Sequence, residues 1–360
     1  MQGHMAALAV LVFLVLQWPP PPVLGADASS AAPLHLVIPC FNEAARLPAR
    51  LYAAYAQKHS TTHFTFVNDG STDGTLQVLF ALSAQLPTQL HVMDLGKNHG
   101  KAEATRLGLQ AAVDSGADVV GFWDADLATP LGTVDDFSKV LAADPDIEMV
   151  FGARVALLGR DIQRLPSRHY LGRIFATLSS WVLSLRIYDT QCGAKLFRNT
   201  AALQTVIATP FGSRWIFDVE MIARFIAIRE HALSSAEDEL RQNPVSSGSG
   251  AGLDADSPVL SGKNSEPLSG GCWERGLCPE VGPPLSSTIY EFPLNSWSDI
   301  AGSKIKWYDK FSALWGLSEI WVTYFSPWAS WTGEAVSVGE SDSVICTTGA
   351  GLGTTCKPEL

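Results

Sequence analysis

Residues Asp118–Asp126 read DVVGFWDAD, an apolar run that ends in two carboxylates separated by one residue. Val, Phe and Trp favour strands, so the run predicts a buried β-strand. Because residues i and i+2 of a strand point to the same side, we expect Asp124 and Asp126 to converge at its carboxyl end. Ligands of open α/β sheets bind at that edge, and carboxylates suit Mg²⁺ or Mn²⁺, which prefer oxygen ligands.

Short apolar strands alternate with helical segments on both sides of this stretch. Other strands are expected at 34–40, 63–69, 90–95 and 147–153, and helices near 44–58, 75–86, 100–115 and 132–143. Strict alternation of this kind is typical of βαβ units. The sequence therefore predicts an α/β fold with a mostly parallel central sheet flanked by helices.

The pattern changes after residue 153. Helices are expected at 168–185 and 216–231, and a strand at 289–294. Residues 232–286 are rich in Ser, Gly, Pro and acidic residues and predict a disordered insertion. We divide the predicted α/β domain into 33–231 and 287–310, and expect a loose tail at 333–360. Residues 311–332 are rich in tryptophan, which fits either a helix in a membrane interface or a helix packed on the domain.

Composition narrows the class of protein. The 360 residues are 47% hydrophobic and carry a net charge of −11. The hydrophobic content excludes a chain that is disordered throughout, and the acidity argues against nucleic acid as a partner.

The N-terminus carries an apolar run, Met5–Trp18, which is short for a membrane span and ends at the prolines Pro19–Pro22. Residues 1–25 are read as an uncleaved signal anchor or a cleaved signal peptide.

Two further strand ends carry polar residues. Asn42 and Glu43 follow the first strand, and Asp69 ends the second, where it is expected to contact a ligand. Turn formation and helix capping explain Ser71, Thr72 and Asp73. Lys97 and Lys101 flank the start of a helix, where they either face phosphates or lie in solvent.

Eight motifs, in order, carry a resemblance to a known family. The sequence letters, from residue 37 onward, are VIPCFNEAARL, FVNDGSTDGT, GKNHGKAEATRLGL, WDADLATP, FGAR, LPSRHYLGRIF, DTQCGAKLF and RWIFDVEMIARF. They resemble family 2 glycosyltransferases, and most closely the members that glucosylate dolichyl phosphate. The resemblance covers about 34–229 and resumes at about 289–306.

The resemblance implies a fold and a reaction. It implies a GT-A-type fold, a UDP-glucose donor, a dolichyl (polyprenyl) phosphate acceptor, and Mg²⁺ or Mn²⁺. The product would be dolichyl β-D-glucosyl phosphate, for assembly of N-glycosylation precursors. It also favours a signal anchor over a cleaved peptide, in the endoplasmic reticulum membrane with the catalytic domain in the cytosol. The alternatives are a mannose synthase using GDP-mannose, or a non-catalytic homologue that binds a sugar nucleotide.

The same resemblance assigns roles to residues of this chain. The uridine site would hold Pro39, Asn42, Glu43 and Asp69, with Lys101 near the nucleotide. Asp124 would contact the diphosphate, both Asp124 and Asp126 the metal, and Asp126 and Arg168 would be the catalytic residues. The acceptor phosphate or the sugar would contact Arg154, Arg168, Gln191, Arg214 and Asp218.

Two observations from the sequence itself bear on the acceptor. Six arginines and one acid lie between Phe151 and Tyr188, and arginine forks fit phosphate oxygens. The apolar stretch Ile174–Leu185 fits either a binding surface for a lipid chain or an ordinary core helix.

Cys40 and Cys192 lie within core motifs and are expected to be reduced. The sequence allows either a disulfide or a metal-binding pair at two further pairs of cysteines, Cys272 with Cys278 and Cys346 with Cys356.

Overall fold

Four parallel strands form the centre of the sheet. They are β1 (Leu34–Cys40), β2 (Thr62–Asn68), β3 (Leu90–Asp94) and β4 (Val119–Trp123), in the order β3-β2-β1-β4. Leu36, Val37 and Ile38 are all fully buried, because helices cover both faces of the sheet. All four strands were predicted. However, β4 ends at Trp123, so the two aspartates lie in the turn after the strand and not within it.

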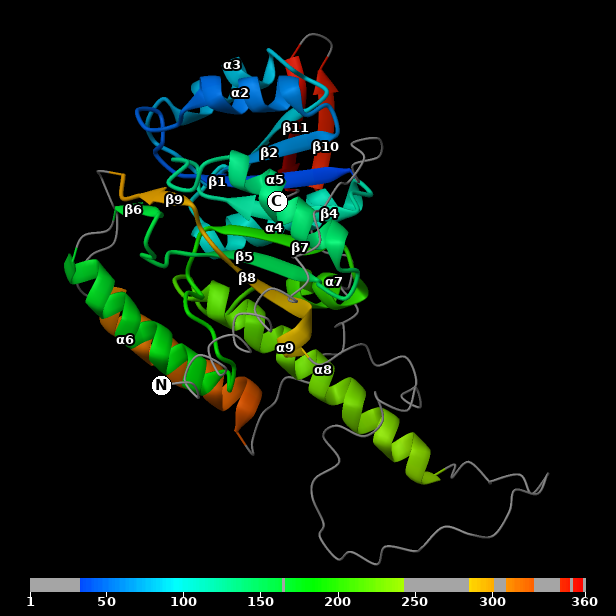
Figure 1. The fold of residues 1–360 in the computed structure, drawn as a ribbon. Coiled ribbons are helices and arrows are strands. Elements are labelled where there is room, and N and C mark those ends of the chain that lie inside the picture. Colours follow the sequence, from blue (N-terminus) through cyan, green and yellow to red (C-terminus); the bar gives the residue numbers. More distant parts are fainter. Residues whose placement is uncertain are drawn as a thin grey trace, which may run out of the picture. The chain divides into compact units, whose positions relative to one another are not determined.

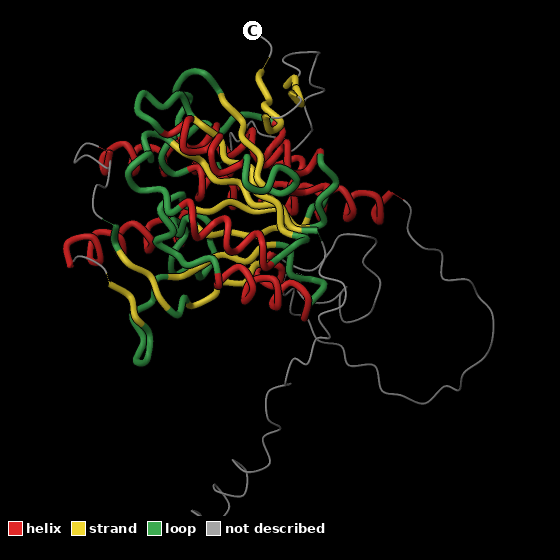
Figure 2. Tube along the Cα trace, turned by 90° about the horizontal axis from the view of Figure 1, so that it is seen from above, coloured by secondary structure: helices red, strands yellow, loops and turns green. Residues whose placement is uncertain are grey.

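The connecting helices cover both faces of this parallel sheet (Figure 2). α2 (Ala49–Lys58), α3 (Thr75–Ser83) and α5 (Gly132–Ala143) pack with one apolar cluster, and α4 (Lys101–Asp114) packs with the other. The predicted helix at 44–58 begins only at Ala49, because residues 41–46 form a turn in which Asn42 has a φ of 51°.

The remaining strands of the domain extend the sheet beyond β4. β7 (Ala194–Arg198) is antiparallel to both β4 and β5 (Met149–Ala153), and β8 (Ile289–Pro293) pairs parallel with β5. The pattern analysis predicted β5 and β8 but missed β7 and the helix after it, α7 (Ala201–Ala208). A small second sheet joins β6 (Asp161–Gln163) to β9 (Ser296–Ser298).

The later helices lie beyond this half of the sheet (Figure 1). α6 (Pro166–Val182) lies beside α10 (Asp309–Ile320), which continues as a π-helical turn, η1 (Trp321–Phe325). α8 (Phe217–Gln242) runs eleven residues past His231, so the predicted end of that helix is wrong. The short helix α9 (Leu285–Thr288) leads into β8. Within the described parts of the chain, no helix combines the length and the apolarity that crossing a bilayer requires.

The far edge of the sheet holds two strands from the C-terminal region. β10 (Val344–Gly349) and β11 (Leu352–Pro358) form an antiparallel pair, and β11 pairs parallel with β3. The expected loose tail is therefore wrong for these residues. The register brings Cys346 opposite Cys356, the pair for which the sequence left a disulfide or a metal pair open.

The computed structural model describes residues 33–163, 166–242, 285–300, 309–326, 344–349 and 352–358. For some of these it describes the backbone alone, namely 166–169, 231–242, 285–286, 309–311, 344–349 and 352–358. The predicted N-terminal segment (1–25) and most of the predicted insertion (243–284) lie outside the described residues.

Candidate active site

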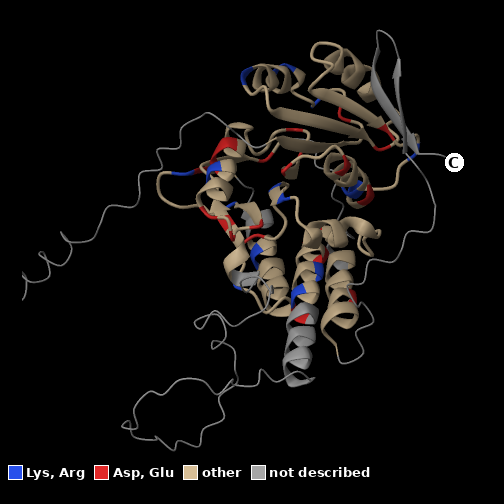
Figure 3. Ribbon diagram, turned by 90° about the vertical axis from the view of Figure 1, so that its right-hand side faces the viewer, with Lys and Arg blue, Asp and Glu red and all other residues tan. Residues whose placement is uncertain are grey.

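The two aspartates lie in a tightly bonded turn after β4. The Asp124 amide donates to the Gly193 carbonyl (2.9 Å), and the Leu127 amide donates to the Asp124 carbonyl (3.1 Å). The Ala128 amide donates to Asp126 Oδ1 (3.1 Å), and Leu127 has a φ of 53°. These bonds give the turn one defined geometry, so both carboxylates remain at the carboxyl end of the sheet. Figure 3 shows that many of the charged residues lie on helices and loops around the sheet.

Two neighbours support this turn from the protein interior. Tyr52 of α2 is fully buried, and its hydroxyl donates to the carbonyls of Ala125 (3.2 Å) and Asp124 (3.4 Å). Burial, followed by the charges of Cys40, Asp126 and Asp124, raises the pKa of Tyr52, so it stays a donor. On the other side, a Cβ added to Gly193 would lie 1.9 Å from Asp124 Oδ2. Only glycine fits there.

Each carboxylate carries a cationic partner. Lys101 Nζ donates to Asp124 Oδ1 (2.6 Å), and Arg46 Nη2 donates to Asp126 Oδ2. Burial alone would lower the pKa of Lys101, but the charges of Asp124 and Asp218 outweigh it and raise that pKa. Two cations and two carboxylates thus meet where β1, β4 and the start of α4 come together. Lys101 is therefore paired with a carboxylate, although 41% of its side chain is exposed to solvent.

The turn after β1 is bonded to the turn after β2. The Asn42 amide donates to Ser71 Oγ (2.9 Å), and Asn42 Oδ1 accepts from the Thr72 amide (2.8 Å). Asp73 accepts from the Thr75 amide (2.9 Å), which confirms the predicted turn role. The predicted capping role is wrong, because the N-cap of α3 is Gly74 and no side chain makes a cap bond there. Pro39 lies beyond the last residue pair between β1 and β4, so its missing N–H costs the sheet nothing. Glu43 is buried and lies 3.4 Å from Arg46 Nε.

Asp69 holds the segment that leads into α4. Its carboxylate accepts from the amides of His99 (2.6 Å) and Gly100 (2.9 Å), and from Asn98 Nδ2 (3.0 Å). It is 3% exposed. The structure therefore gives Asp69 a structural role, positioning the segment before Lys101, and its contact with a ligand stays a prediction.

Arg214 and Asp218 flank the same segment. Arg214 Nη2 donates to the His99 carbonyl (3.0 Å). Asp218 is buried and lies 2.9 Å from Nζ of Lys195, a fully buried lysine on β7. That ammonium also donates to the carbonyls of Cys192 (2.7 Å) and Thr190 (2.9 Å). The charge of Asp218 thus raises the pKa of Lys101. The Asp218 carboxylate itself is paired with the buried Lys195.

Two of the predicted acceptor residues, Arg154 and Gln191, lie around the loop before β7. Arg154 binds Asp189 through two nitrogens, at 2.5 and 2.7 Å. Together with Gln191 and Arg173, these two residues line a cavity of about 10 Å³, room for about one water. Arg154 therefore already has a carboxylate partner. Arg168 lies in the first turn of α6, and its side chain is outside the described residues.

The site fits a divalent cation held jointly with a phosphorylated ligand. Asp124 and Asp126 supply oxygen donors, with 36% and 16% of their side chains exposed. Among the described residues, no group of three or more His, Cys, Asp or Glu forms a metal cage. Mg²⁺ is usually bound by one or two carboxylates together with substrate phosphates, and this donor set matches that arrangement.

Pattern reasoning missed two residues of this centre. Arg46, the partner of Asp126, lies three residues after Glu43, within the motif VIPCFNEAARL, but the sequence assigned it no role. Lys195 lies between the apolar residues Ala194 and Leu196 of β7, and a lysine flanked in this way in a strand is itself a signal of a buried ion pair. Both buried cysteines, Cys40 and Cys192, are free thiols as expected, and burial raises the pKa of Cys192 to about 11.

Comparison with curated proteins identifies similar sequences. The human dolichyl-phosphate beta-glucosyltransferase is 35% identical over 225 residues, which cover 57% of this chain and 68% of the relative. The Drosophila melanogaster protein of the same name is 33% identical, covering 54% and 63%. A polyprenol monophosphomannose synthase from Mycolicibacterium smegmatis is 25% identical, covering 56% and 76%. The chain spans about three-fifths of the length of the first curated relatives it matches.

Solved structures and a family description complete the comparison. Glucosyl-3-phosphoglycerate synthase from Mycobacterium tuberculosis, in complex with Mn²⁺, UDP-glucose and phosphoglyceric acid, superimposes with a TM-score of 0.50 at 13% identity, covering 85% of this chain and 86% of that one. This likeness confirms the predicted GT-A-type α/β fold. Residues 35–220 match the family described as "Glycosyl transferase family 2". The chain belongs to glycosyl transferase family 2.

Proposed function

We propose that this chain transfers glucose from UDP-glucose to the phosphate of dolichyl phosphate, or a related polyprenyl phosphate, with inversion at the anomeric carbon. Curated relatives with 31–35% identity bear the name of that activity. The observation that carries the proposal is the double pairing of Asp124 with Lys101 and of Asp126 with Arg46 at the sheet edge. Such a centre offers cations to a diphosphate and carboxylates to a divalent cation.

The residues on the donor side bind and orient the nucleotide. Lys101 and Arg46 are placed to exchange their carboxylate partners for diphosphate oxygens when the donor enters. Asp69 keeps the amides of His99 and Gly100 in place, which fixes the start of α4, and Arg214 holds the same segment from the opposite side. The uridine would lie over Pro39, Asn42 and Glu43. Positioning of this kind accounts for much of the catalysis expected of a single displacement.

The chemistry needs little proton transfer. A phosphate monoester is ionised at pH 7 and attacks the anomeric carbon as the bond to UDP breaks, so a strong general base is not required. One displacement converts an α-linked donor into a β-linked product. Asp124 and Asp126 would hold Mg²⁺ or Mn²⁺, which supplies Lewis-acid stabilisation of the departing diphosphate. Arg168, placed near the acceptor by resemblance, would contact the attacking phosphate.

Exposed apolar residues support a lipid acceptor. On α6 they recur at helical spacing and are 70%, 59%, 37% and 78% exposed at Tyr170, Ile174, Leu178 and Trp181. A second set lies on α10 and η1, at Leu314, Trp315, Trp321 and Val322. Tryptophan-bearing faces of this kind suit the boundary between headgroups and acyl chains. We propose that these helices rest on the cytosolic side of the endoplasmic reticulum membrane.

A donor competition assay tests the proposal. The protein is incubated with dolichyl phosphate and Mg²⁺ or Mn²⁺, with labelled UDP-glucose, UDP-galactose and GDP-mannose offered separately. We expect transfer from UDP-glucose, and its loss by at least about a hundredfold in Asp126→Ala, because the variant removes a carboxylate that would hold the divalent cation. Preferred use of GDP-mannose would establish the mannose synthase alternative instead. Full activity of Asp126→Ala would contradict the assigned role of that carboxylate.

A further inference from the structure

A buried ion pair on α8 lies apart from the catalytic carboxylates. Glu220 and Arg224 are each 3% exposed, one helical turn apart, with Arg224 Nη2 2.9 Å from Glu220 Oε1. Desolvation offsets most of the attraction within such a pair, so the pair alone adds little stability. Its other hydrogen bonds show which part of the chain it holds.

Most of those bonds go to one loop, residues 209–213, and a further one joins Arg224 Nη1 to the Val206 carbonyl on α7 (2.8 Å). Arg224 donates from Nη1 to the Thr209 carbonyl (2.8 Å) and from Nη2 to the Pro210 carbonyl (2.6 Å). Glu220 accepts from the amides of Gly212 (3.1 Å) and Ser213 (3.0 Å), one on each carboxylate oxygen. The loop is thus fixed by its carbonyls at one end and by its amides at the other.

The C-terminal helix contributes the last member of this network. The Tyr324 hydroxyl, on η1, donates to Glu220 Oε1 (2.9 Å) and accepts from Arg224 Nε (3.0 Å). Tyr324 is 8% exposed. Burial, and then the charge of Glu220, raise the pKa of Tyr324, so its hydroxyl keeps its proton. A residue 100 positions along the chain therefore binds both members of the ion pair.

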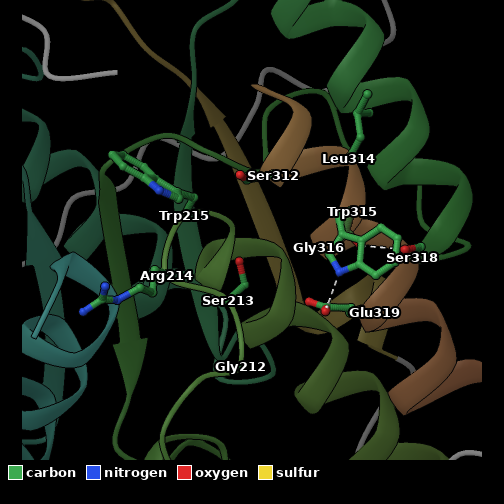
Figure 4. Close-up of a pocket in the computed structure, with 10 residues that line it drawn as sticks. All are labelled: Gly212, Ser213, Arg214, Trp215, Ser312, Leu314, Trp315, Gly316, Ser318 and Glu319. Atoms are coloured by element: carbon green, nitrogen blue, oxygen red, sulfur yellow. Dashed lines mark hydrogen bonds between the residues drawn. The ribbon is translucent and has the colours of Figure 1, made fainter. Parts of the chain in front are cut away.

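The loop continues directly into the candidate active site. Arg214 follows Ser213 and donates to the His99 carbonyl, and its Nε would lie 3.3 Å from a Cβ on Gly100. Lys101, the partner of Asp124, comes next in the chain. Arg214 also lines a groove of about 870 Å³, together with Trp315 and Glu319 of α10. Figure 4 shows the Arg214 side chain pointing away from α10.

We propose that Glu220, Arg224 and Tyr324 are positioning residues of the donor site, through which the C-terminal helix α10–η1 sets the 209–214 loop and, by way of Arg214, the segment before Lys101. Only the expected effect on the KM for UDP-glucose rests on the proposed function; the positioning of the loop does not. None of the three needs to touch the substrate. Since α10 and η1 also carry an exposed tryptophan face, the same segment links a surface of the molecule to the donor site.

Tyr324→Phe tests this proposal, because it removes the hydroxyl and keeps the buried ring. We expect the amides of Gly212 and Ser213 to exchange hydrogen for deuterium about tenfold faster, since one bond to their common acceptor is lost. The KM for UDP-glucose should rise about three- to tenfold with kcat within twofold, because the change loosens binding rather than chemistry. Tyr55→Phe is the matched control: it also removes a bond from a tyrosine hydroxyl to a carboxylate, Asp135 Oδ1 at 2.6 Å, away from the loop.

The control separates positioning from stability. Tyr55→Phe should lower Tm comparably while leaving the donor KM and the exchange of the loop unchanged. Unchanged exchange at Gly212 and Ser213 together with an unchanged donor KM in Tyr324→Phe would overturn the proposal. So would an equal rise in KM in both variants, which would show a general loss of stability. If the unaltered protein transfers no glucose, the proposed function fails, and the exchange measurement decides the positioning role by itself.

Discussion

Gly193 has no side chain, and the Asp124 carboxylate fills the space that one would occupy. The three nearest atoms to an added Cβ all belong to that carboxylate, at 1.9, 2.2 and 2.5 Å. The motif around Gly193 was visible in the sequence, but the reason for its glycine was not. The contact joins Gly193, the residue before β7, to a turn 69 positions earlier. It depends on the antiparallel register of β4 with β7, and β7 was not predicted.

Gly193→Ala is therefore expected to act on the reaction more than on the fold. The methyl group must displace the Asp124 carboxylate, so we expect kcat/KM to fall at least about a hundredfold, as for loss of a group that stabilises transition-state charge. Gly132→Ala is the control, because nothing lies within 4 Å of an added Cβ there. Steady-state kinetics with circular dichroism of both variants would test this. Equal activity of the two variants would show that Asp124 tolerates displacement.

Among the elements, the first three strands bring three histidines together at their amino ends. The ring centroids of His35, His63 and His91 lie 6.0 to 6.1 Å apart. His35 also bonds Thr65 Oγ1 (2.8 Å) and Ser115 Oγ (3.2 Å). The strands themselves were predicted from their apolar runs, yet their register, which creates this cluster, was not. Register depends on pairing between strands, and a single-strand pattern does not encode it.

This cluster predicts acid sensitivity. Burial, and the rings of His91 and His63, lower the pKa of His35 to about 3, from about 6.5 in an unfolded chain. The unfolded chain thus binds a proton over a range in which the folded protein does not. The contribution of neutral His35 to the free energy of unfolding is therefore present above about pH 6.5 and is lost as the pH falls towards 3. Between pH 7 and 5 we expect the free energy of unfolding to fall by about 2 kcal/mol.

Denaturant unfolding at several pH values measures this loss. His35→Asn should flatten the dependence of unfolding free energy on pH between 7 and 5, although the variant loses stability at pH 7. An unchanged slope in His35→Asn would assign the acid sensitivity to other groups.

At the scale of the molecule, charge and apolar surface are segregated. The sequence showed the acidic excess and the tryptophan-rich segment, and it predicted a site at the carboxyl ends of the strands, where Asp124, Asp126 and Lys101 lie with their ionic partners. The pairing of β10 and β11 with the sheet, and the extra turns of α8, were not predicted. Polar composition alone suggested loose chain there, whereas strands and long helices can form from such sequences when neighbouring elements supply the partners.

The exposed faces of α6 and α10 predict membrane association. Trp181→Ser combined with Trp315→Ser should weaken binding to phosphatidylcholine vesicles by about tenfold or more, because two exposed indoles no longer enter the interface. Vesicle sedimentation measures the binding. Leu51→Ser, which alters an exposed leucine on α2, should leave it unchanged. Equal binding by both variants would locate the membrane contact elsewhere in the chain.

The central claim is that the site at the ends of β1, β2 and β4 transfers glucose directly to a lipid phosphate. The most direct measurement is NMR of the product formed from UDP-[1-¹³C]glucose and a short polyprenyl phosphate. The single displacement derived above predicts a glucosyl phosphate with the β configuration at C1. An α-configured product, or free glucose without any glucosyl lipid, would contradict the claim.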